Sequence, residues 1–398
     1  MKRTIKFFVL LLLVFAMVSC NGVNGDGLGT TDTTPTVDPK PDGQEPLVLS
    51  AQSKTDYTLI YPAEESAALS NTVSYLQNQF YKNTKASISC LSDESEETAY
   101  EILLGNTNRT ESMLAEPPAE DEFLIRAVGT KILIQVGCDA SVTNALECFF
   151  DSLLDTNGVQ TLPAAFEMRS KVSYVNFKVA TFNIHNGLDV SYSFGVLAQD
   201  IVKSGATVVA LQEIDQFTER NQYQDTLKIL SEQTGFPYYA YHETLPLGKD
   251  GKYGIAVLSK YPIDSFHGEW LPRNGSKEPR AALKTVINVA GISLSFVSTH
   301  CDGGIIAEEL DTIREMVEND RFYVVGGDFN NQNYQMFEVF QNANLANSKE
   351  KPLVTTENGK YIDNLICSGD ILIRSAKAID TNHSDHFMVV ADIRIYIQ

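Results

Sequence analysis

The sequence predicts an α/β protein in which a four-layer α/β/β/α two-sheet sandwich follows a small α/β domain. From Tyr174 onward, segments rich in Val, Ile, Phe and Tyr alternate with turn residues, as β-strands do. Amphipathic helical patterns lie between some of these segments. The chain has 398 residues, which is too long for one ordinary core and suits two domains.

The first element is an export signal over residues 1–20. A basic start precedes an apolar run that is too short to be a confident membrane span. The run ends in Val18-Ser19-Cys20, which resembles a bacterial lipobox. We therefore expect lipidation at Cys20, which would tether the protein to a membrane without spanning it. A signal cleaved elsewhere is the alternative.

Residues 21–46 form the second element, a linker of Gly, Thr, Asp and Pro with almost nothing to bury. Such a composition predicts a flexible tether. Signal and linker together predict an exported protein of the cell envelope, lipid-anchored to a bacterial membrane. Either a periplasmic or a cell-surface location is compatible with this pattern.

Residues 47–170 form the predicted small α/β domain. The stretch "SAALSNTVSYLQNQFYKNT" has apolar residues at helical spacing, and "FLIRAVGTKILIQVG" reads as a hairpin. Through "EILLGNTNR" and "ALECFFDSLL", the segment resembles the small N-terminal domain of several secreted carbohydrate-active enzymes. It has no clustered catalytic residues, so we assign it no chemistry.

Residues 174–398 form the predicted sandwich. Its first helix is "FGVLAQDIVKSG", which ends at Gly205. The apolar face predicted for this helix consists of Phe194, Leu197, Ile201 and Val202. A second amphipathic helix is predicted near residues 306–317. Strands on both sides of these helices would pack as two sheets with helices outside.

Charge and cysteine content narrow the functional classes. Lys and Arg number 31 against 51 Asp and Glu, a formal net charge of −20. This balance argues against a surface built to grip nucleic acid phosphates. A phosphate-bearing substrate would need local help such as a bound cation. Beyond Cys20 there are five cysteines without metal-finger spacing, which favours buried thiols or one disulfide.

Polar side chains lie after, within or just before six of the predicted strands, at what would be one edge of the sandwich. They are Asn183, Glu213, His300, Asp328, Asn330, Asp363, Asp385 and His386. Each has a plain alternative explanation, such as an Asx turn at "DFN" or a zinc site at "HSDH". Taken together, with no Ser or Cys nucleophile beside a base, they predict a hard-metal phosphoester site.

A family resemblance gives these residues roles. "TFNIHNG", "VVALQEID", "YGIAVLSKYPI", "EPRAAL", "VSTHCD", "GGDFNN", "IDNLICS" and "SDHFMVV" occur in the order seen in the endonuclease/exonuclease/phosphatase superfamily. The resemblance covers residues 175–398. It implies a metal-dependent hydrolase that attacks phosphorus in line with an activated water.

The resemblance implies Mg²⁺ as the cofactor, with Mn²⁺ as the alternative. Glu213 would be the principal ligand, with Asn183 beside it, and Asp385 would be the further acid. This set suits Mg²⁺, which takes few protein ligands and keeps waters and substrate phosphate for the rest.

The resemblance also implies the catalytic groups. Asp328 would deprotonate the attacking water, and Asn330 would hold a non-bridging phosphate oxygen. His386 would contact the phosphate, with its ring held by Asp363. His300 would bind phosphate or assist the leaving group, and Arg280 would lie near the substrate phosphate. Gly326 and Gly327 would leave room for the substrate's approach.

Several functions share this site. The first is an exported, membrane-tethered phosphodiesterase, or a phosphomonoesterase. The alternatives are a secreted nuclease with DNA or RNA as substrate, a sphingomyelinase-like lipid phosphodiesterase, and a non-catalytic glycan-binding lipoprotein. For the lipid enzyme, "HGEWLP" around Trp270 is the one candidate for membrane entry, and we expect that Trp to be packed. We expect a monomer.

Overall fold

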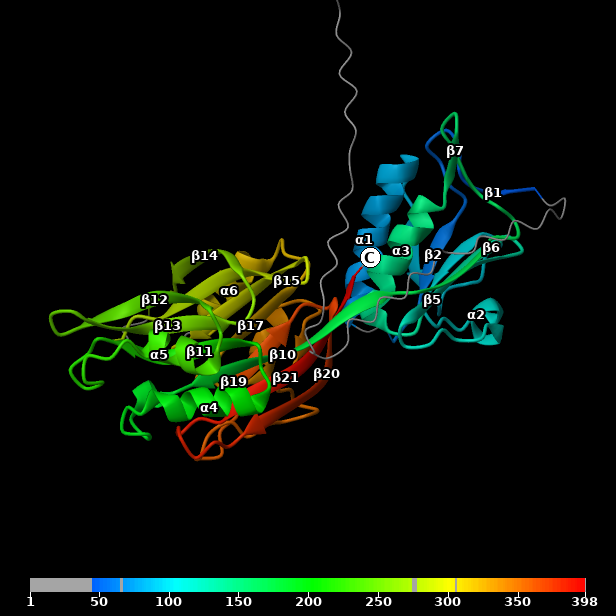
Figure 1. Ribbon diagram of the computed structural model, residues 1–398. Coiled ribbons are helices and arrows are strands. Elements are labelled where there is room, and N and C mark those ends of the chain that lie inside the picture. The colour runs from blue at the N-terminus through cyan, green and yellow to red at the C-terminus, as the bar shows by residue number, and fades with distance from the viewer. Residues whose placement is uncertain (1–44, 65–66, 274–277, 305, 398) are drawn as a thin grey trace, which may run out of the picture.

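The computed structural model describes residues 45–64, 67–273, 278–304 and 306–397 (Figure 1). The predicted signal, Cys20 and nearly all of linker 21–46 lie outside this range. Among the described residues, no helix has the length and apolar character needed to cross a membrane.

The N-terminal unit contains two sheets. Their strands are β1 (Leu47–Ser50), β2 (Thr58–Tyr61), β3 (Ser89–Ser92), β4 (Glu101–Leu104), β5 (Glu122–Val128), β6 (Lys131–Val136), β7 (Leu154–Thr156), β8 (Val159–Leu162) and β9 (Glu167–Lys171). The six-stranded sheet has the order β3-β2-β4-β6-β5-β9, and the three-stranded sheet the order β1-β8-β7.

Helices cover this unit. They are α1 (Ala67–Thr84), α2 (Thr110–Leu114), the 3-10 turn η1 (Asp139–Ser141) and α3 (Val142–Asp151). Leu76 and Phe80 of α1 share one buried cluster with Phe149 of α3 and the inner strands. The hairpin predicted at "VGTK" joins β5 to β6.

The larger unit contains the other two six-stranded sheets. The first has the order β12-β13-β11-β10-β21-β20 and consists of β10 (Ser173–Asn183), β11 (Val208–Gln216), β12 (Tyr238–Leu247), β13 (Gly251–Ser259), β20 (Ile371–Ile379) and β21 (Met388–Ile397). The second has the order β14-β15-β16-β17-β19-β18 and consists of β14 (Ile263–Trp270), β15 (Ala281–Val289), β16 (Ile292–His300), β17 (Tyr323–Asp328), β18 (Asn344–Leu345) and β19 (Asp363–Cys367).

The two sheets pack face to face with helices outside. The helices and turns are η2 (His185–Gly187), α4 (Phe194–Ser204), α5 (Thr226–Thr234), α6 (Ile306–Val317) and η3 (Tyr334–Val339). One cluster joins the inner faces of both sheets, for example through Val179 and Phe296. Separate clusters pack α4 and α5 on the first sheet, and α6 and η3 on the second. The predicted α/β/β/α class is confirmed.

The predicted apolar face of α4 is wrong at one position. Phe194, Leu197 and Ile201 are buried against the sheet, but Val202 is 51% exposed. Consecutive helical residues point about 100° apart, so Ile201 and its successor cannot both face a narrow contact. The helix ends as predicted at Gly205, which has a φ of +77°.

Trp270 also differs from expectation, because it is 51% exposed instead of packed. It ends β14, the edge strand of its sheet, so one side of the ring has no neighbouring strand. The ring lies edge-on against His242 of β12, with centroids 5.1 Å apart. The cysteine expectation resolves to thiols: Cys90, Cys138, Cys148, Cys301 and Cys367 are all free.

Strand direction gathers the polar strand ends at one edge of the sandwich. β10 and β11 run parallel, as do β16 and β17, so each pair sends its carboxyl ends the same way. In the second sheet, His300 lies opposite Asp328, which in turn lies opposite Asp363. This edge is where the candidate site forms.

Candidate active site

Asp328 is the centre of the site. It ends β17 and is 1% exposed. Its Oδ1 accepts the backbone N–H of Asn330 at 2.9 Å, so the Asx turn considered from sequence is present. Its Oδ2 accepts a hydrogen bond from Asn183 Nδ2 at 3.1 Å. The Nε2 atoms of His300 and His386 lie 3.5 and 3.6 Å from the same oxygen.

The surroundings of Asp328 tune its acidity. Burial, and then the negative charge of Asp363, raise the pKa of Asp328 to about 7. The imidazole of His386 opposes this rise. A carboxyl group with a pKa near neutrality exchanges protons readily at physiological pH, which is what a general base must do.

His386 is held by Asp363. Its Nδ1 lies 3.1 and 3.0 Å from the two carboxylate oxygens of Asp363. Burial alone would lower the pKa of His386, but the charge and hydrogen bond of Asp363 outweigh it and raise this pKa to about 9. The ring is therefore an imidazolium at neutral pH, with its Nε2–H directed toward Asp328.

His300 has the opposite character. Burial, then the positive charges of Arg280 and His386, lower the pKa of His300 well below its usual value. Arg280 Nη1 lies 3.0 Å from His300 Nδ1. A guanidinium can only donate, so Nδ1 accepts and Nε2 carries the proton of a neutral ring.

Asn330 and Asn331 organise the loop after β17. Asn330 has a left-handed φ of +50°, and its Nδ2 donates to the Cys301 carbonyl at 3.1 Å. The same nitrogen is 3.1 Å from His300 Nε2, but both atoms carry hydrogens when Nδ1 of that ring is the acceptor, so the two are close neighbours without a hydrogen bond. Asn331, for which the sequence suggested no role, donates through Nδ2 to the carbonyl of Gly303 at 3.0 Å. Both amides thus fasten this loop to the one after β16.

Glu213 is turned by an irregularity in its strand. The pairing of β11 with β13 shifts between Leu211 and Ile214, and Glu213 between them has a φ of +58°. A bulge of this kind re-aims one side chain, and strained backbone of this kind clusters at functional sites. Asn183 Nδ2 lies 3.2 Å from Glu213 Oε1.

Asp385 and Asp189 both lie beside the ring of His185. His185 Nδ1 is 2.8 Å from Asp189 Oδ2 and 3.4 Å from Asp385 Oδ1. Burial would lower the pKa of His185, but the bond to Asp189 and the charges of Asp385 and Glu213 raise it. Asp189 belongs to this cluster and was not found from sequence, although it lies four residues after His185 on the same turn.

Two groups of acidic and histidine side chains at the site have the chemistry to hold a divalent cation. The ligand atoms of His185, Asp189 and Asp385 lie within 4.8 Å of one another, as do those of Asp328, Asp363 and His386. Together with Glu213, these groups offer mostly oxygen donors, which hard cations prefer. Asn183 turns its amide nitrogen toward Glu213, and its oxygen accepts from the His185 N–H at 3.0 Å. Asn183 can therefore ligate only after its amide turns over.

The two glycines before Asp328 have a different purpose from the predicted one. A Cβ on Gly327 would lie 2.4 Å from the Thr299 carbonyl of the neighbouring strand. A Cβ on Gly326 would meet Leu365, Ala210 and Thr181, which pack between the sheets. These glycines permit close packing around β17, so the prediction that they clear the substrate's approach is wrong.

Supporting residues escaped the sequence prediction. Glu309 of α6 is fully buried, and its two oxygens accept the Asp302 N–H at 2.9 and 3.0 Å. Ser384 donates to the Asn183 carbonyl at 2.8 Å, and its Oγ accepts the His386 N–H. The only available signal was Ser384's place in "HSDH", where a Ser two residues before the histidine suits a local turn.

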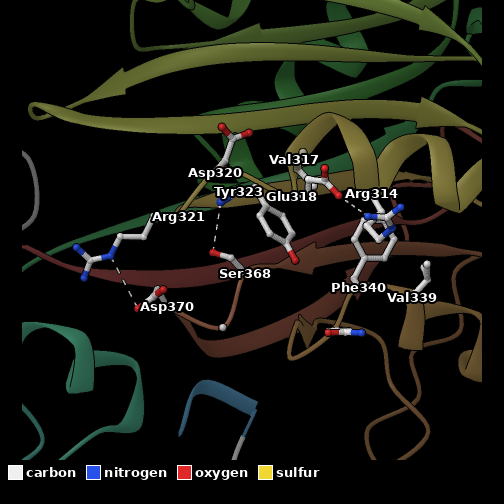
Figure 2. A pocket seen from close by; sticks show the side chains of 12 residues that line it. Arg314, Val317, Glu318, Asp320, Arg321, Tyr323, Val339, Phe340, Ser368 and Asp370 are labelled. Carbon is white, nitrogen blue, oxygen red and sulfur yellow. Dashed lines mark hydrogen bonds and ion pairs between the residues drawn. The ribbon is translucent and has the colours of Figure 1, made fainter. Parts of the chain in front are cut away.

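A large cavity elsewhere in the sandwich is not part of this site. It has a volume of about 590 Å³ and is lined by Arg314, Arg321, Tyr323 and Asp370 (Figure 2). Tyr323 begins β17 and Asp328 ends it, which separates them by about 17 Å along an extended strand. The arginines of this cavity are paired with acids, Arg314 with Glu318 and Arg321 with Asp370.

Comparison with known proteins agrees with the geometry. A sequence profile described as the endonuclease/exonuclease/phosphatase family matches residues 180–386. A search of curated proteins found no significant match. The matched range contains each of the strand-end residues described above.

Solved structures with a similar fold cover about half of this chain. A family protein from Leptotrichia buccalis is 20% identical, with 55% of this chain and 99% of that chain covered and a TM-score of 0.46. A mannosyl-6-phosphatase from Bacteroides thetaiotaomicron is 18% identical, with 55% and 99% covered and a TM-score of 0.44. The human Nocturnin catalytic domain with bound sulfate is 17% identical, with 57% and 98% covered and a TM-score of 0.45.

Proposed function

This chain belongs to the endonuclease/exonuclease/phosphatase family. From that premise we propose that it hydrolyses a phosphodiester with the help of a divalent cation, with Mg²⁺ as the preferred ion and Mn²⁺ as the alternative. The observation that carries the proposal is the buried Asp328 carboxylate, which faces an imidazolium, a neutral imidazole and an amide. These groups supply a base, a cation and hydrogen-bond donors around one point.

The cation would be held by Glu213 and Asp385, with the Asn183 oxygen as a further ligand after rotation of its amide. When bound, the cation would neutralise negative charge on the phosphate. This protein needs such neutralisation because its own formal net charge is −20. The excess of acids at the rim would otherwise repel the substrate.

Asp328 performs the base step. Its carboxylate takes a proton from water, and the resulting oxygen nucleophile forms a bond to phosphorus as the ester oxygen opposite departs. The His386 imidazolium and the Asn330 amide donate to non-bridging oxygens as negative charge builds there. The departing oxygen leaves as an alkoxide, which the imidazolium can protonate. No enzyme group becomes bonded to phosphorus.

The first experiment is hydrolysis of bis(p-nitrophenyl) phosphate with and without EDTA. We expect EDTA to abolish turnover and Asp328→Ala to lower kcat by about 10²- to 10⁴-fold, the usual contribution of a general base. Asp264→Asn, an exposed acid on β14, is the matched control and should behave as wild type. Equal rates for wild type and Asp328→Ala would refute the proposal.

A lipid phosphodiester is a second candidate substrate. Trp270 is 51% and Phe266 61% exposed on β14, where the sequence suggested a packed Trp. Exposed aromatics of this kind suit contact with a membrane interface. Wild type should then hydrolyse sphingomyelin in vesicles. A Trp270→Ala variant that loses this activity, but still hydrolyses a soluble diester, would support this candidate. Plasmid DNA digestion tests the nuclease alternative in parallel.

We also propose export and tethering through Cys20. The support is the sequence pattern of residues 1–20 and the linker that follows it. Mass spectrometry of the mature protein should find a lipid-modified Cys20, and Cys20→Ser should release the protein from membranes. A mature N-terminus at another residue would contradict this proposal.

A further inference from the structure

A second cavity, of about 690 Å³, adjoins the catalytic edge. It lies between the loop that follows β11, residues 217–224, and the β12–β13 hairpin, residues 247–251. Both segments lie at this edge of the sandwich. The loop directly follows β11, the strand that carries Glu213, and the first residues of β13 pair with the last residues of β11. The lining residues that matter below are Phe217, Tyr223, Glu219, Arg220, Lys249 and Asp250.

Two aromatic side chains of the cavity are held out toward solvent. Phe217 is 42% and Tyr223 is 65% exposed. Their φ angles are +54° and +58°, a left-handed conformation that is costly for bulky residues. Phe217 N donates to the Gln224 carbonyl at 3.0 Å, and Tyr223 N donates to the Thr218 carbonyl at 2.8 Å. Backbone strain that is held in place in this way tends to mark functional loops.

The loop is fastened from below. Asn221 Nδ2 lies within 3.3 Å of the Asp215 and Gln224 carbonyls and of Thr226 Oγ1. Opposite it, the hairpin approaches so closely that a Cβ on Gly251 would lie 2.9 Å from Thr218 Cα. Both walls of the cavity are therefore fixed before any ligand arrives, which lowers the entropy cost of binding.

Tyr253 connects this cavity to the catalytic centre. Arg220 lies over the Tyr253 ring, 5.6 Å from its centroid, and binds Asp215 through two hydrogen bonds of 2.5 and 2.7 Å. Tyr253 also lines a narrow gap together with Arg280 and His300 of the catalytic centre. Arg220 and Tyr253 therefore form a continuous line of side chains between the cavity and His300 of the catalytic centre, along which we place one arm of a bound ester.

The charges of the cavity select the kind of group that fits. Arg220 is paired with Asp215, and the lining of the cavity contains Lys249 together with two acids, Glu219 and Asp250. This lining gives no net attraction to a polyanion, whose binding depends on many cations. Carboxylates and an ammonium do suit hydroxyl groups, and aromatic faces suit the apolar face of a saturated ring.

We propose that this cavity binds a neutral sugar ring, carried as one ester arm of the substrate. The assignment of the ring to the substrate depends on the proposed phosphodiester hydrolysis, whereas the binding of the ring does not. Phe217 and Tyr223 are specificity residues that contact the sugar, and they take no part in the chemistry at phosphorus.

The binding test uses saturation-transfer NMR on the metal-free protein with methyl hexopyranosides, and with adenosine and uridine as competitors of another class. We expect the hexosides to bind wild type in the millimolar range and Tyr223→Ala about tenfold more weakly. Phe266→Ala removes an equally exposed ring outside the cavity and should bind as wild type. Failure of every hexoside to bind, binding of nucleosides alone, or equal effects of both variants would overturn the proposal.

The kinetic test compares a hexose-bearing phosphodiester with dimethyl phosphate on the metal-loaded enzyme. Tyr223→Ala should raise KM about tenfold for the hexose ester and leave kcat/KM for dimethyl phosphate unchanged. If wild type hydrolyses both esters and Tyr223→Ala changes neither, the sugar site is refuted and the phosphodiesterase stands. If wild type hydrolyses neither but binds hexosides through Tyr223, the hydrolytic function fails and the sugar site stands.

Discussion

At the scale of single residues, opposite charges around Asp328 create the chemistry. His386 and His300 have the same side chain, yet the Asp363 carboxylate outweighs burial and makes His386 an imidazolium, whereas burial and the positive charge of Arg280 keep His300 neutral. The two imidazole rings thus differ in charge: His386 gives Asp328 a charged hydrogen-bond donor, and His300 gives it an uncharged one.

Asp363 should control the charge of His386. We expect Asp363→Asn to lower the pKa of His386 from about 9 toward its ordinary value, because the charge that stabilises the imidazolium is removed. Activity should fall about 10- to 100-fold, as is usual when the orienting partner of a histidine is removed. NMR titration of the His386 ring checks the first effect, and an unchanged titration would contradict it.

The residues of the site were largely predictable, but their contacts were not. The acids, amides and histidines stand in local motifs at strand ends, and the structure brings Asn183, Asp328, Asp363, His300 and His386 together. Asp385 instead contacts His185, and Arg280 contacts His300. These pairings depend on how loops far apart in sequence meet, which no local pattern specifies.

At the scale of elements, β17 and α6 position the site. β17 fits between its neighbours because it has no side chain at Gly327, where a Cβ would lie 2.4 Å from the Thr299 carbonyl. α6 presents the buried Glu309, which fixes the loop after His300 through the Asp302 N–H. Neither purpose was visible in the sequence, because each depends on a neighbouring element.

Replacing Gly327 should destabilise the sandwich. Gly327→Ala forces the strand away from Thr299, so we expect a loss of about 1–3 kcal/mol of unfolding free energy. Gly304→Ala is the control, because the nearest atom to its added Cβ is 3.5 Å away. Urea denaturation measures both. A Gly327→Ala protein as stable as the control would show that the strand spacing is not limiting.

Glu309 should make stability depend on pH. Burial raises the pKa of Glu309 to about 7 in the folded protein, above its ordinary value near 4.5. The folded state holds this proton more tightly than the unfolded state, so stability falls as pH rises from about 4.5 to 7 and remains lower above that. The loss from this group is up to about 3 kcal/mol.

Glu309→Gln tests this dependence. The amide carries no charge at any pH, and its oxygen can still accept the Asp302 N–H. Denaturation at pH 5 and pH 8 should show a smaller loss of stability in the variant than in wild type. Because Asp328 contributes in the same direction in both proteins, the difference between them isolates Glu309. Equal losses would contradict the assignment.

At the scale of the whole molecule, the fold class could be predicted from the periodic spacing of apolar residues, but the position of exposed aromatic side chains could not. Alternating strands and amphipathic helices predict the four layers because burial imposes those periods. The exposure of Trp270, Phe217 and Tyr223 arises from an edge strand and a left-handed loop, where burial imposes no pattern. The features that bear on substrate choice are therefore the ones that only the structure locates.

The net charge of −20 should govern which phosphates approach. We expect no measurable binding of duplex DNA at 50 mM salt, because like charges repel and few counterions would be released. Hydrolysis of a small diester should change little between 50 and 200 mM salt. Fluorescence anisotropy measures the first and initial rates the second. Tight DNA binding that weakens steeply with salt would favour the nuclease alternative.

The most direct test of the central claim is a Mg²⁺ titration of phosphodiester hydrolysis by wild type, Glu213→Gln and Asp328→Asn. We predict that Glu213→Gln needs more Mg²⁺ but regains much of its rate at saturation, because the residue acts by holding the cation. Asp328→Asn should remain about 10²- to 10⁴-fold slower at every concentration, because it has lost the base. Wild-type turnover without a divalent cation, or Asp328→Asn restored to the wild-type rate, would contradict the account.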